Sequence, residues 1–207
     1  WGMSGESIEG EGKDLAKAQK MSKQSLDLIQ AAMDDLEASK PDYYTQKQWK
    51  RSLTYNYGMY ADTYALISYK LGDHEEALQY QKIAAENYEF NNGEMNERYA
   101  IFHEKVKGTA ATMSLLEKMI RTNAATSTMK DQYKRIFLAT QTREQAFDKY
   151  MATLKTEANA EYLKEIKDKM LDEEAPLFTL TNLKGEEVAL EELKGKEQIG
   201  IKDIAEK

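Results

Sequence analysis

The sequence contains no cysteine among its 207 residues. Disulfides, thiolate metal sites and thiol chemistry are therefore excluded within this chain, because each of them needs a cysteine sulfur. The only two histidines, His74 and His103, fall on separate predicted helices and lack the H-E-x-x-H spacing of a zinc site. We predict structural roles for both histidines. We assign no catalytic, cofactor-binding or metal-binding residue and expect no cofactor.

Positive charge and long apolar runs are also scarce. Lysine and arginine total 29 against 36 aspartates and glutamates, so the formal net charge is −7. Such a chain offers no basic face for phosphates, which argues against nucleic-acid binding. No apolar run approaches the roughly 20 residues that cross a bilayer. The start, Trp1-Gly2-Met3, lacks the basic and apolar regions of a signal peptide, although a mature or trimmed chain would look the same.

Proline is rare too, and the stretch between Pro41 and Pro176 is predicted to be helical. Residues 1–11, rich in glycine, serine and glutamate, predict a flexible lead-in. Residues 12–171 predict one helical domain, and 172–207 a β-hairpin segment. The first helix is expected from about Lys13 to Ser39 and ends before Pro41, because the residue preceding a proline avoids the helical region. Asp42 is predicted to cap the helix that follows.

Residues 51–90 predict an antiparallel pair of helices around which the chain is organised. Gly72 is expected to end the first helix, and Asp73 to cap the second. Three alanines, Ala65, Ala77 and Ala84, would let the two helix axes approach closely. The first helix carries one apolar stripe at spacings of three and four, formed by Leu53, Tyr57, Tyr60, Tyr64, Ile67 and Leu71. The many tyrosines are open to two interpretations, an aromatic ligand groove or helix packing, and we favour packing.

The following segments predict further helices. Asn91-Asn92-Gly93 is expected to form a turn with Gly93 at positive φ. A second hairpin is predicted over 94–121, closing at Gly108, and another helix contains Met129, Tyr133 and Ile136. A long amphipathic helix over 143–171 is expected to pack through a stripe of Phe147, Met151, Leu154, Ala158, Tyr162, Ile166 and Met170. Its mixed charges do not favour a membrane surface.

The C-terminal segment changes character. Residues 177–181 and 186–190 are strand-like, with a turn at 182–185 between them, which predicts a β-hairpin. Two strands alone are barely stable in water, so we expect this hairpin to be marginally ordered. Its apolar residues would be partly exposed unless the helical domain or a second copy of the chain covers them. A weak homodimer through this hairpin is therefore expected.

The pair of helices at 51–90 resembles a tetratricopeptide (TPR) unit. Ala65, Gly72, Ala77 and Ala84 fall at the small-residue positions of that family. The aromatic of the second helix is displaced by one position, to Tyr80, and the closing proline is absent. One unit cannot bury both of its faces, so neighbouring helices must complete the core. The predicted fold class is mainly α, with TPR-like antiparallel helical hairpins and a short C-terminal β-hairpin.

Residues 175–196 read APLFTLTNLKGEEVALEELKGK. This stretch resembles the opening of the thioredoxin-like TlpA/ResA and AhpC/TSA proteins, A-P-x-F-x-L-x-x-x-x-G-x-x-V-x-L-x-x-L-K-G-K. The preceding helix is similar to the linker helix of TlpA-like proteins from Bacteroides-type bacteria, in which a helical, TPR-like region precedes a thioredoxin domain. The resemblance implies a periplasmic or cell-envelope location and a thiol–disulfide oxidoreductase as the parent protein. The family then continues into W-C-x-x-C, but here Glu197-Gln198-Ile199-Gly200 follows, so no catalytic residue carries over.

Two classes of function remain open. The first is a non-catalytic helical module of an envelope thiol–disulfide oxidoreductase, which positions the redox domain or its client. The second is a free-standing TPR-like adaptor that binds a peptide. A protein or peptide partner is expected in both cases. The stretch at 175–196 favours the first, because an adaptor has no use for it. A carboxylate-based enzyme is disfavoured, because scattered acidic pairs on acidic helices usually form a solvated face.

Overall fold

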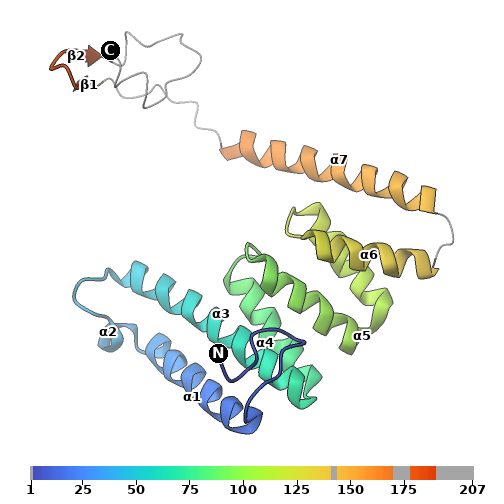
Figure 1. The fold of residues 1–207 in the computed structure, drawn as a ribbon. Coiled ribbons are helices and arrows are strands. Elements are labelled where there is room, and N and C mark those ends of the chain that lie inside the picture. The colour runs from blue at the N-terminus through green and yellow to red at the C-terminus, as the bar shows by residue number, and fades with distance from the viewer. Residues whose placement is uncertain (1, 141–143, 170–177, 190–207) are drawn as a thin grey trace. The chain divides into compact units, whose positions relative to one another are not determined.

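The computed structural model describes residues 2–140, 144–169 and 178–189, and this part of the chain is mainly helical (Figure 1). A short two-stranded sheet lies at its C-terminal end, so the predicted class, mainly α with a C-terminal β-hairpin, is confirmed. The elements in chain order are α1 (Leu15–Asp34), α2 (Leu36–Ser39), α3 (Gln46–Leu71), α4 (His74–Asn87), α5 (Gly93–Arg121), α6 (Ser127–Thr140), α7 (Glu144–Lys169), β1 (Thr179–Thr181) and β2 (Glu187–Ala189).

The prediction of one helix over 13–39 is wrong, because the helix is interrupted at Asp35. Asp35 leaves the helical region (φ −127°, ψ 77°), and its carboxylate accepts the N–H of Ala38 at 3.1 Å, which begins α2. The cap of α3 is also not Asp42 but Thr45. The hydroxyl of Thr45 accepts the N–H of Gln48 at 3.2 Å, and the Gln48 side chain accepts the N–H of Thr45 at 3.0 Å. This reciprocal pair is a capping box.

Helices α3 and α4 form the predicted antiparallel pair. Gly72 ends α3 in the left-handed region at φ 93°, where a side chain would be strained. Ala65, Ala77 and Ala84 are completely buried, as the close approach of the two axes requires. A Cβ on Gly58, also buried in α3, would lie 3.0 Å from the Cβ of Asn87 in α4. The small residues therefore set the distance between these helices.

Two details of this pair differ from the sequence prediction. Asp73 occupies the N-cap position of α4, but its side chain makes no capping hydrogen bond. Leu71, predicted as the last member of the buried stripe, is 40% exposed. It lies in the final turn of α3, where the chain already turns toward α4. Within the stripe, Leu53, Tyr64 and Ile67 are buried, and Tyr57 and Tyr60 are half-buried.

The connection from α4 to α5 also corrects a prediction. Gly93 is the first residue of α5 and does not have positive φ. The left-handed residues are Glu89 (φ 51°) and Phe90 (φ 57°). Asn92 caps α5, and its side chain accepts the N–H of Met95 at 3.1 Å. The turn is therefore formed at Glu89 and Phe90, earlier in the chain than the position of Gly93 predicted.

Helix α5 folds back on itself at Gly108, so the predicted second hairpin is confirmed (Figure 1). Gly108 has φ 79° and ψ 173°, a conformation that essentially only glycine adopts. Tyr99 and Met119 line one cavity, although a straight helix would place them about 30 Å apart. His103 and Thr112 join the two arms, with His103 Nδ1 lying 2.8 Å from Thr112 Oγ1.

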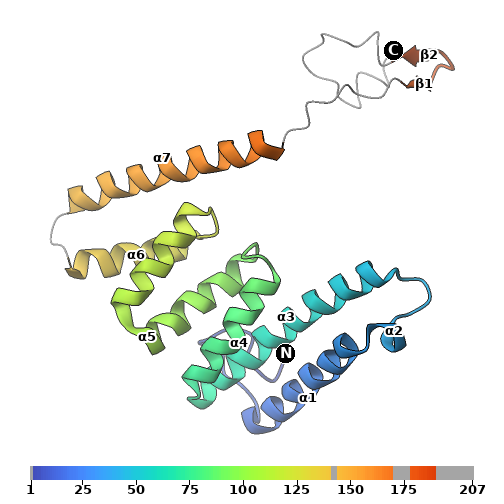
Figure 2. The same cartoon turned by 180° about the vertical axis from the view of Figure 1, so that it is seen from behind.

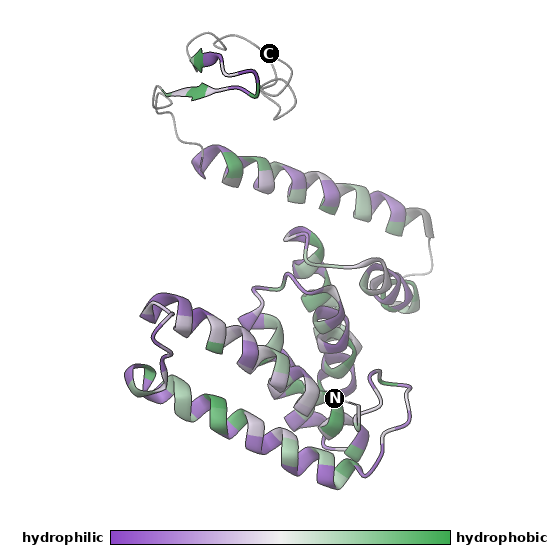
Figure 3. Ribbon diagram, turned by 60° about the vertical axis from the view of Figure 1, so that its left-hand side comes forward, coloured by the Kyte–Doolittle hydropathy of each residue, from purple (hydrophilic) through white to green (hydrophobic). Residues whose placement is uncertain are grey.

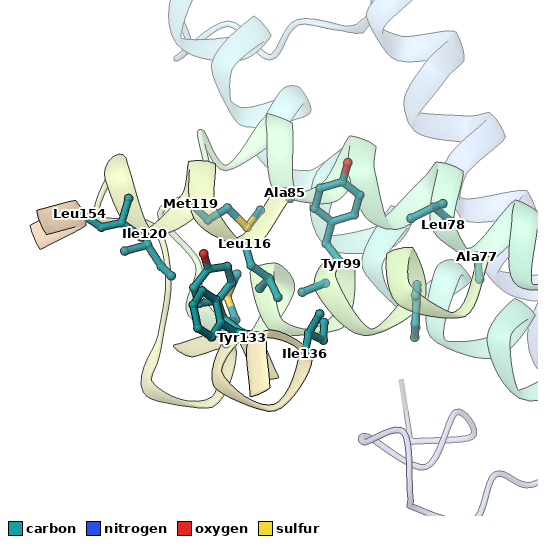
Figure 4. Packing of buried hydrophobic residues seen from close by; sticks show 14 of the residues in the cluster. Ala77, Leu78, Ala85, Tyr99, Leu116, Met119, Ile120, Tyr133, Ile136 and Leu154 are labelled. Carbon is teal, nitrogen blue, oxygen red and sulfur yellow. The ribbon is translucent and has the colours of Figure 1, made fainter. Parts of the chain in front are cut away.

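The main core joins α3–α4 to the later helices. Figure 4 shows Tyr99 and Leu116, from the two arms of α5, beside Tyr133 and Ile136 of α6. Ribbons coloured by hydropathy show apolar and polar residues interspersed along the helices (Figure 3). The buried members of this cluster are Ala65, Ala77, Leu78, Ala85, Tyr99, Ala100, Phe102, Leu116, Met119, Ile120, Met129, Tyr133, Ile136, Phe137, Phe147 and Leu154.

The stripe of α7 is buried only in its first half. Phe147, Leu154 and Ala158 are buried, whereas Tyr162 is 56% and Ile166 40% exposed. The expectation that the whole stripe packs is therefore wrong for its second half. The last predicted member, Met170, lies outside the described residues, as does the start of the predicted helix at residue 143.

The strands β1 and β2 pair antiparallel, with Leu180 opposite Val188. The Asn182 side chain shapes the turn by accepting the N–H of Lys184 at 2.9 Å and the N–H of Glu186 at 3.0 Å. Gly185 completes the turn at φ 84°. The hairpin predicted from sequence is therefore present, while residues 170–177 and 190–207, which contain the rest of the predicted segment, lie outside the described residues. The chain divides into two compact units, 1–164 and 165–207.

Candidate functional site

A buried ion pair connects three helices of the larger unit. Asp62 of α3 is 3% exposed and binds Arg98 of α5 through two bonds, Nε to Oδ1 at 2.9 Å and Nη2 to Oδ2 at 2.8 Å. Gln81 of α4 donates to Asp62 Oδ1 at 2.7 Å and to the carbonyl of Met95 at 3.1 Å. Both carboxylate oxygens are thus occupied and removed from solvent. The group cannot act as a general base toward a substrate, and we interpret it as the link that holds α3, α4 and α5 in register.

Sequence reasoning missed this cluster. Asp62 lies off the predicted apolar stripe of α3, so the sequence pattern did not mark it as buried. Gln81 stands where the TPR resemblance expects an aromatic, and this polar residue was the available signal. Their partner, Arg98, lies 36 residues from Asp62 and could not be paired with it from the sequence alone.

A second, more exposed cluster follows the same pattern between α5 and α6. Glu104 accepts hydrogen bonds from Arg135 at 2.6 Å and from Gln132 at 2.7 Å. Burial opposes ionisation of Glu104, but these two hydrogen bonds outweigh it and hold the pKa of the carboxyl below its ordinary value. The side chain of Arg135 is 59% exposed. Both clusters are therefore structural links between successive helices.

Both histidines contact other residues of the helical unit. The ring of His74 lies 4.8 Å from that of Tyr69, centroid to centroid. Because the Thr112 hydroxyl donates to the carbonyl of Gly108 at 2.9 Å, its oxygen accepts from His103, whose Nδ1 therefore carries a proton. Burial lowers the pKa of His103, and the charge of Lys107 lowers it further. His103 thus links the two arms of α5 through its hydrogen bond with Thr112.

One candidate binding feature in the described part of the chain is a groove between α1 and α3, which we call the α1–α3 groove. Its volume is about 640 Å³, within the range of small ligand sites. The two helices lie side by side in both views of the fold (Figure 1, Figure 2). None of the described lining residues is charged, although 31% of the chain is. They are Gly2, Met3, Ala18, Met21, Ser22, Gln24, Ser25, Leu28, Met59, Tyr60, Thr63 and Ile67.

The N-terminal segment closes one part of this groove through Gly2 and Met3. Lys70 of α3 holds the segment by donating to two carbonyls, that of Ser4 at 2.5 Å and that of Gly10 at 2.6 Å. Burial lowers the pKa of Lys70. The segment that we predicted to be a flexible lead-in thus has a defined attachment to α3, which composition did not indicate.

Other sites are less distinctive. A second cavity of about 440 Å³ lies between the end of α4 and the arms of α5, and its lining includes the charged Lys82, Glu86 and Lys118. Among the described residues, no group of three or more histidine, aspartate or glutamate side chains could hold a metal ion. No helix in the described ranges has the length and apolarity needed to span a bilayer. No protein-family model, curated protein or solved structure matches this chain.

Proposed function

We propose that this chain is the non-catalytic helical module of a cell-envelope, thioredoxin-like thiol–disulfide oxidoreductase. In this proposal the helices position the redox domain or its client, and the thiols belong to a separate part of the parent protein. The proposal rests on the TlpA/ResA-like stretch at 175–196. The observation that supports it best is the β-hairpin at 178–189. It lies within this stretch, and its two strands pair antiparallel, as we expect for the first hairpin of such a domain.

The exposure of that hairpin also supports the proposal. Phe178 is 49% and Leu180 51% exposed, and both belong to the stretch that resembles the domain opening. Two short strands do not bury such residues by themselves. In a complete thioredoxin-like domain, the remaining sheet would cover them.

The experiment is to sequence the reading frame that encodes this chain and to assay its complete product. We expect codons for a W-C-x-x-C motif beyond those for the present chain, and a product that reduces insulin disulfides. The 207-residue chain alone serves as the matched control and should equal the buffer blank, because it has no thiolate nucleophile. A frame that closes without any cysteine pair would refute the proposal.

The second candidate is a peptide-binding adaptor, and the α1–α3 groove is the observation that favours it. An uncharged groove with methionines on its walls suits apolar side chains of varied shape. The two candidates differ in what they require. An adaptor needs no redox domain to bind its partner. If the complete protein lacks a cysteine pair and still binds a peptide, that result would favour the adaptor.

A further inference from the structure

The walls of the α1–α3 groove are two helical stripes. On α1 the stripe consists of Ala18, Met21, Ser25 and Leu28, with spacings of three, four and three. This spacing keeps side chains on one face of a helix, where a partner helix can pack. On α3 the facing stripe is Met59, Thr63 and Ile67, with spacings of four. The α1 stripe is about 15 Å long, which corresponds to nearly three turns of a helix.

This α1 stripe is distinct from the one that holds α1 in the fold. Leu26 is 1% exposed and clusters with Ala61 and Tyr64 of α3. Leu28 is 73% exposed and Met21 51%, and Met59 on the facing wall is 43% exposed. Helix α1 therefore has one apolar face that is covered through Leu26 and a second that is buried at Ala18, 6% exposed, but uncovered at Met21 and Leu28.

The distribution of charged residues in and around the groove indicates which kind of partner it can bind. The described lining includes no acidic or basic side chain, so the groove suits an uncharged apolar stripe. Beside it on α1 stand Lys17 and Lys20, both exposed. At 100° per residue they lie on the flank of the Met21–Leu28 stripe that faces away from the buried Leu26. No ion pair within the described residues includes either lysine. Basic charge beside a groove of an otherwise acidic protein is complementary to an acidic edge.

We propose that the α1–α3 groove binds one amphipathic helix of a partner protein. Its apolar stripe lies between the stripes of α1 and α3, and an acidic edge of the same helix meets Lys17 and Lys20. The methionines adapt to the apolar side chains, and the two lysines fix the orientation of the helix. This site specifies the partner of the groove that favours the second candidate function, the adaptor. It does not depend on the redox-module proposal, since it uses only α1, α3 and the N-terminal segment.

The test uses the full 207-residue chain and fluorescein-labelled model peptides of about 18 residues, acetylated and amidated, in a fluorescence anisotropy titration. The first peptide has leucines along one helical face, alanines elsewhere and glutamates along one edge. The second has lysines in place of those glutamates, and the third is a scrambled form of the first. We expect saturable binding of the glutamate-edged peptide, binding of the lysine-edged peptide that is at least about tenfold weaker, and none of the scrambled peptide.

Variants locate the binding. The double variant Met21→Gln/Leu28→Gln should weaken binding of the glutamate-edged peptide by at least about tenfold. The matched control Leu71→Gln also removes an exposed leucine, but outside the groove lining, and should leave binding unchanged. The double variant Lys17→Glu/Lys20→Glu should reverse the preference between the two charged peptides. All these side chains are exposed, so an unchanged circular dichroism spectrum is expected for each variant.

Three results would overturn the proposal. One is the absence of saturable binding by the glutamate-edged peptide. Another is equal weakening by Met21→Gln/Leu28→Gln and by Leu71→Gln, which would place the peptide elsewhere. The third is tighter binding to vesicles of phosphatidylglycerol than to the peptide, lost in Lys17→Glu/Lys20→Glu, which would identify the lysine flank as a membrane-binding surface instead.

Discussion

Removal of Arg98 should destabilise the fold far more than removal of an exposed arginine. In Arg98→Met, the carboxylate of Asp62 stays buried at 3% exposure with only the Gln81 amide as partner. An uncompensated buried charge of this kind costs about 3–5 kcal/mol. The variant Asp62→Leu leaves the Arg98 guanidinium, whose side chain is 11% exposed, with only the exposed Glu94 as a carboxylate partner, 4.0 Å away. The double variant removes both charges, and Gln81 still donates to the carbonyl of Met95. It should therefore be much more stable than the sum of the two single effects implies.

The measurement is a double-mutant cycle by urea unfolding, followed by far-ultraviolet circular dichroism. We expect a coupling free energy between Asp62 and Arg98 of about 3 kcal/mol, the upper end for residues in contact. The pair Glu104–Arg135 is the matched control, because it is also a carboxylate–arginine pair between two helices but its arginine is 59% exposed. Its coupling should be about 0.2–1 kcal/mol. Equal coupling in the two cycles, or a cost below about 1 kcal/mol for Arg98→Met, would refute the view that this buried pair holds the three helices together.

Further predictions concern the α5 turn, pH and self-association. Gly108→Ala should lower the free energy of unfolding by about 1–3 kcal/mol, measured by urea unfolding, because only glycine suits its conformation, although a Cβ would meet no atom within 4 Å. The pKa values of His103 and Glu104 are both lower in the folded chain than their ordinary values, so the unfolded chain binds more protons. Stability should therefore fall as pH drops below about 6.5 and again below about 4.3, with the first step lost in His103→Gln and the second in Glu104→Gln. Sedimentation should show weak, concentration-dependent dimers of the full chain and none of a version ending at Asp172; identical monomers would contradict pairing through the hairpin.

The sequence predicted those features that depend on local signals. Gly72 and Gly108 each follow an apolar stripe in the sequence, and the chain reverses direction at both glycines in the structure. The turn of the β-hairpin was equally local. Thr45 is also marked by a local signal, because T-x-x-Q is a capping-box pattern, and this pattern identifies the cap of α3 better than the position of Asp42 after Pro41.

Features that depend on distant contacts could not be predicted. The pairing of Asp62 with Arg98 joins different helices, and only the tertiary fold brings them together. Periodicity identifies apolar faces but does not tell whether another element covers them. Tyr162 and Leu28 belong to regular stripes, yet both are exposed. For the same reason, the α1–α3 groove could not be predicted from the sequence, because its walls come from two helices that only the tertiary fold brings side by side.

The central claim, that the helices position a redox domain or its client, is tested most directly by comparing two substrates. The complete product of the reading frame and its redox domain alone would each be assayed with insulin and with a small disulfide, 5,5′-dithiobis(2-nitrobenzoic acid). We predict that removal of the helical module lowers kcat/KM for insulin by at least about tenfold and leaves kcat/KM for the small disulfide unchanged, because positioning affects only a substrate that the helices can contact. Equal kcat/KM values for insulin with and without the helices would contradict the account.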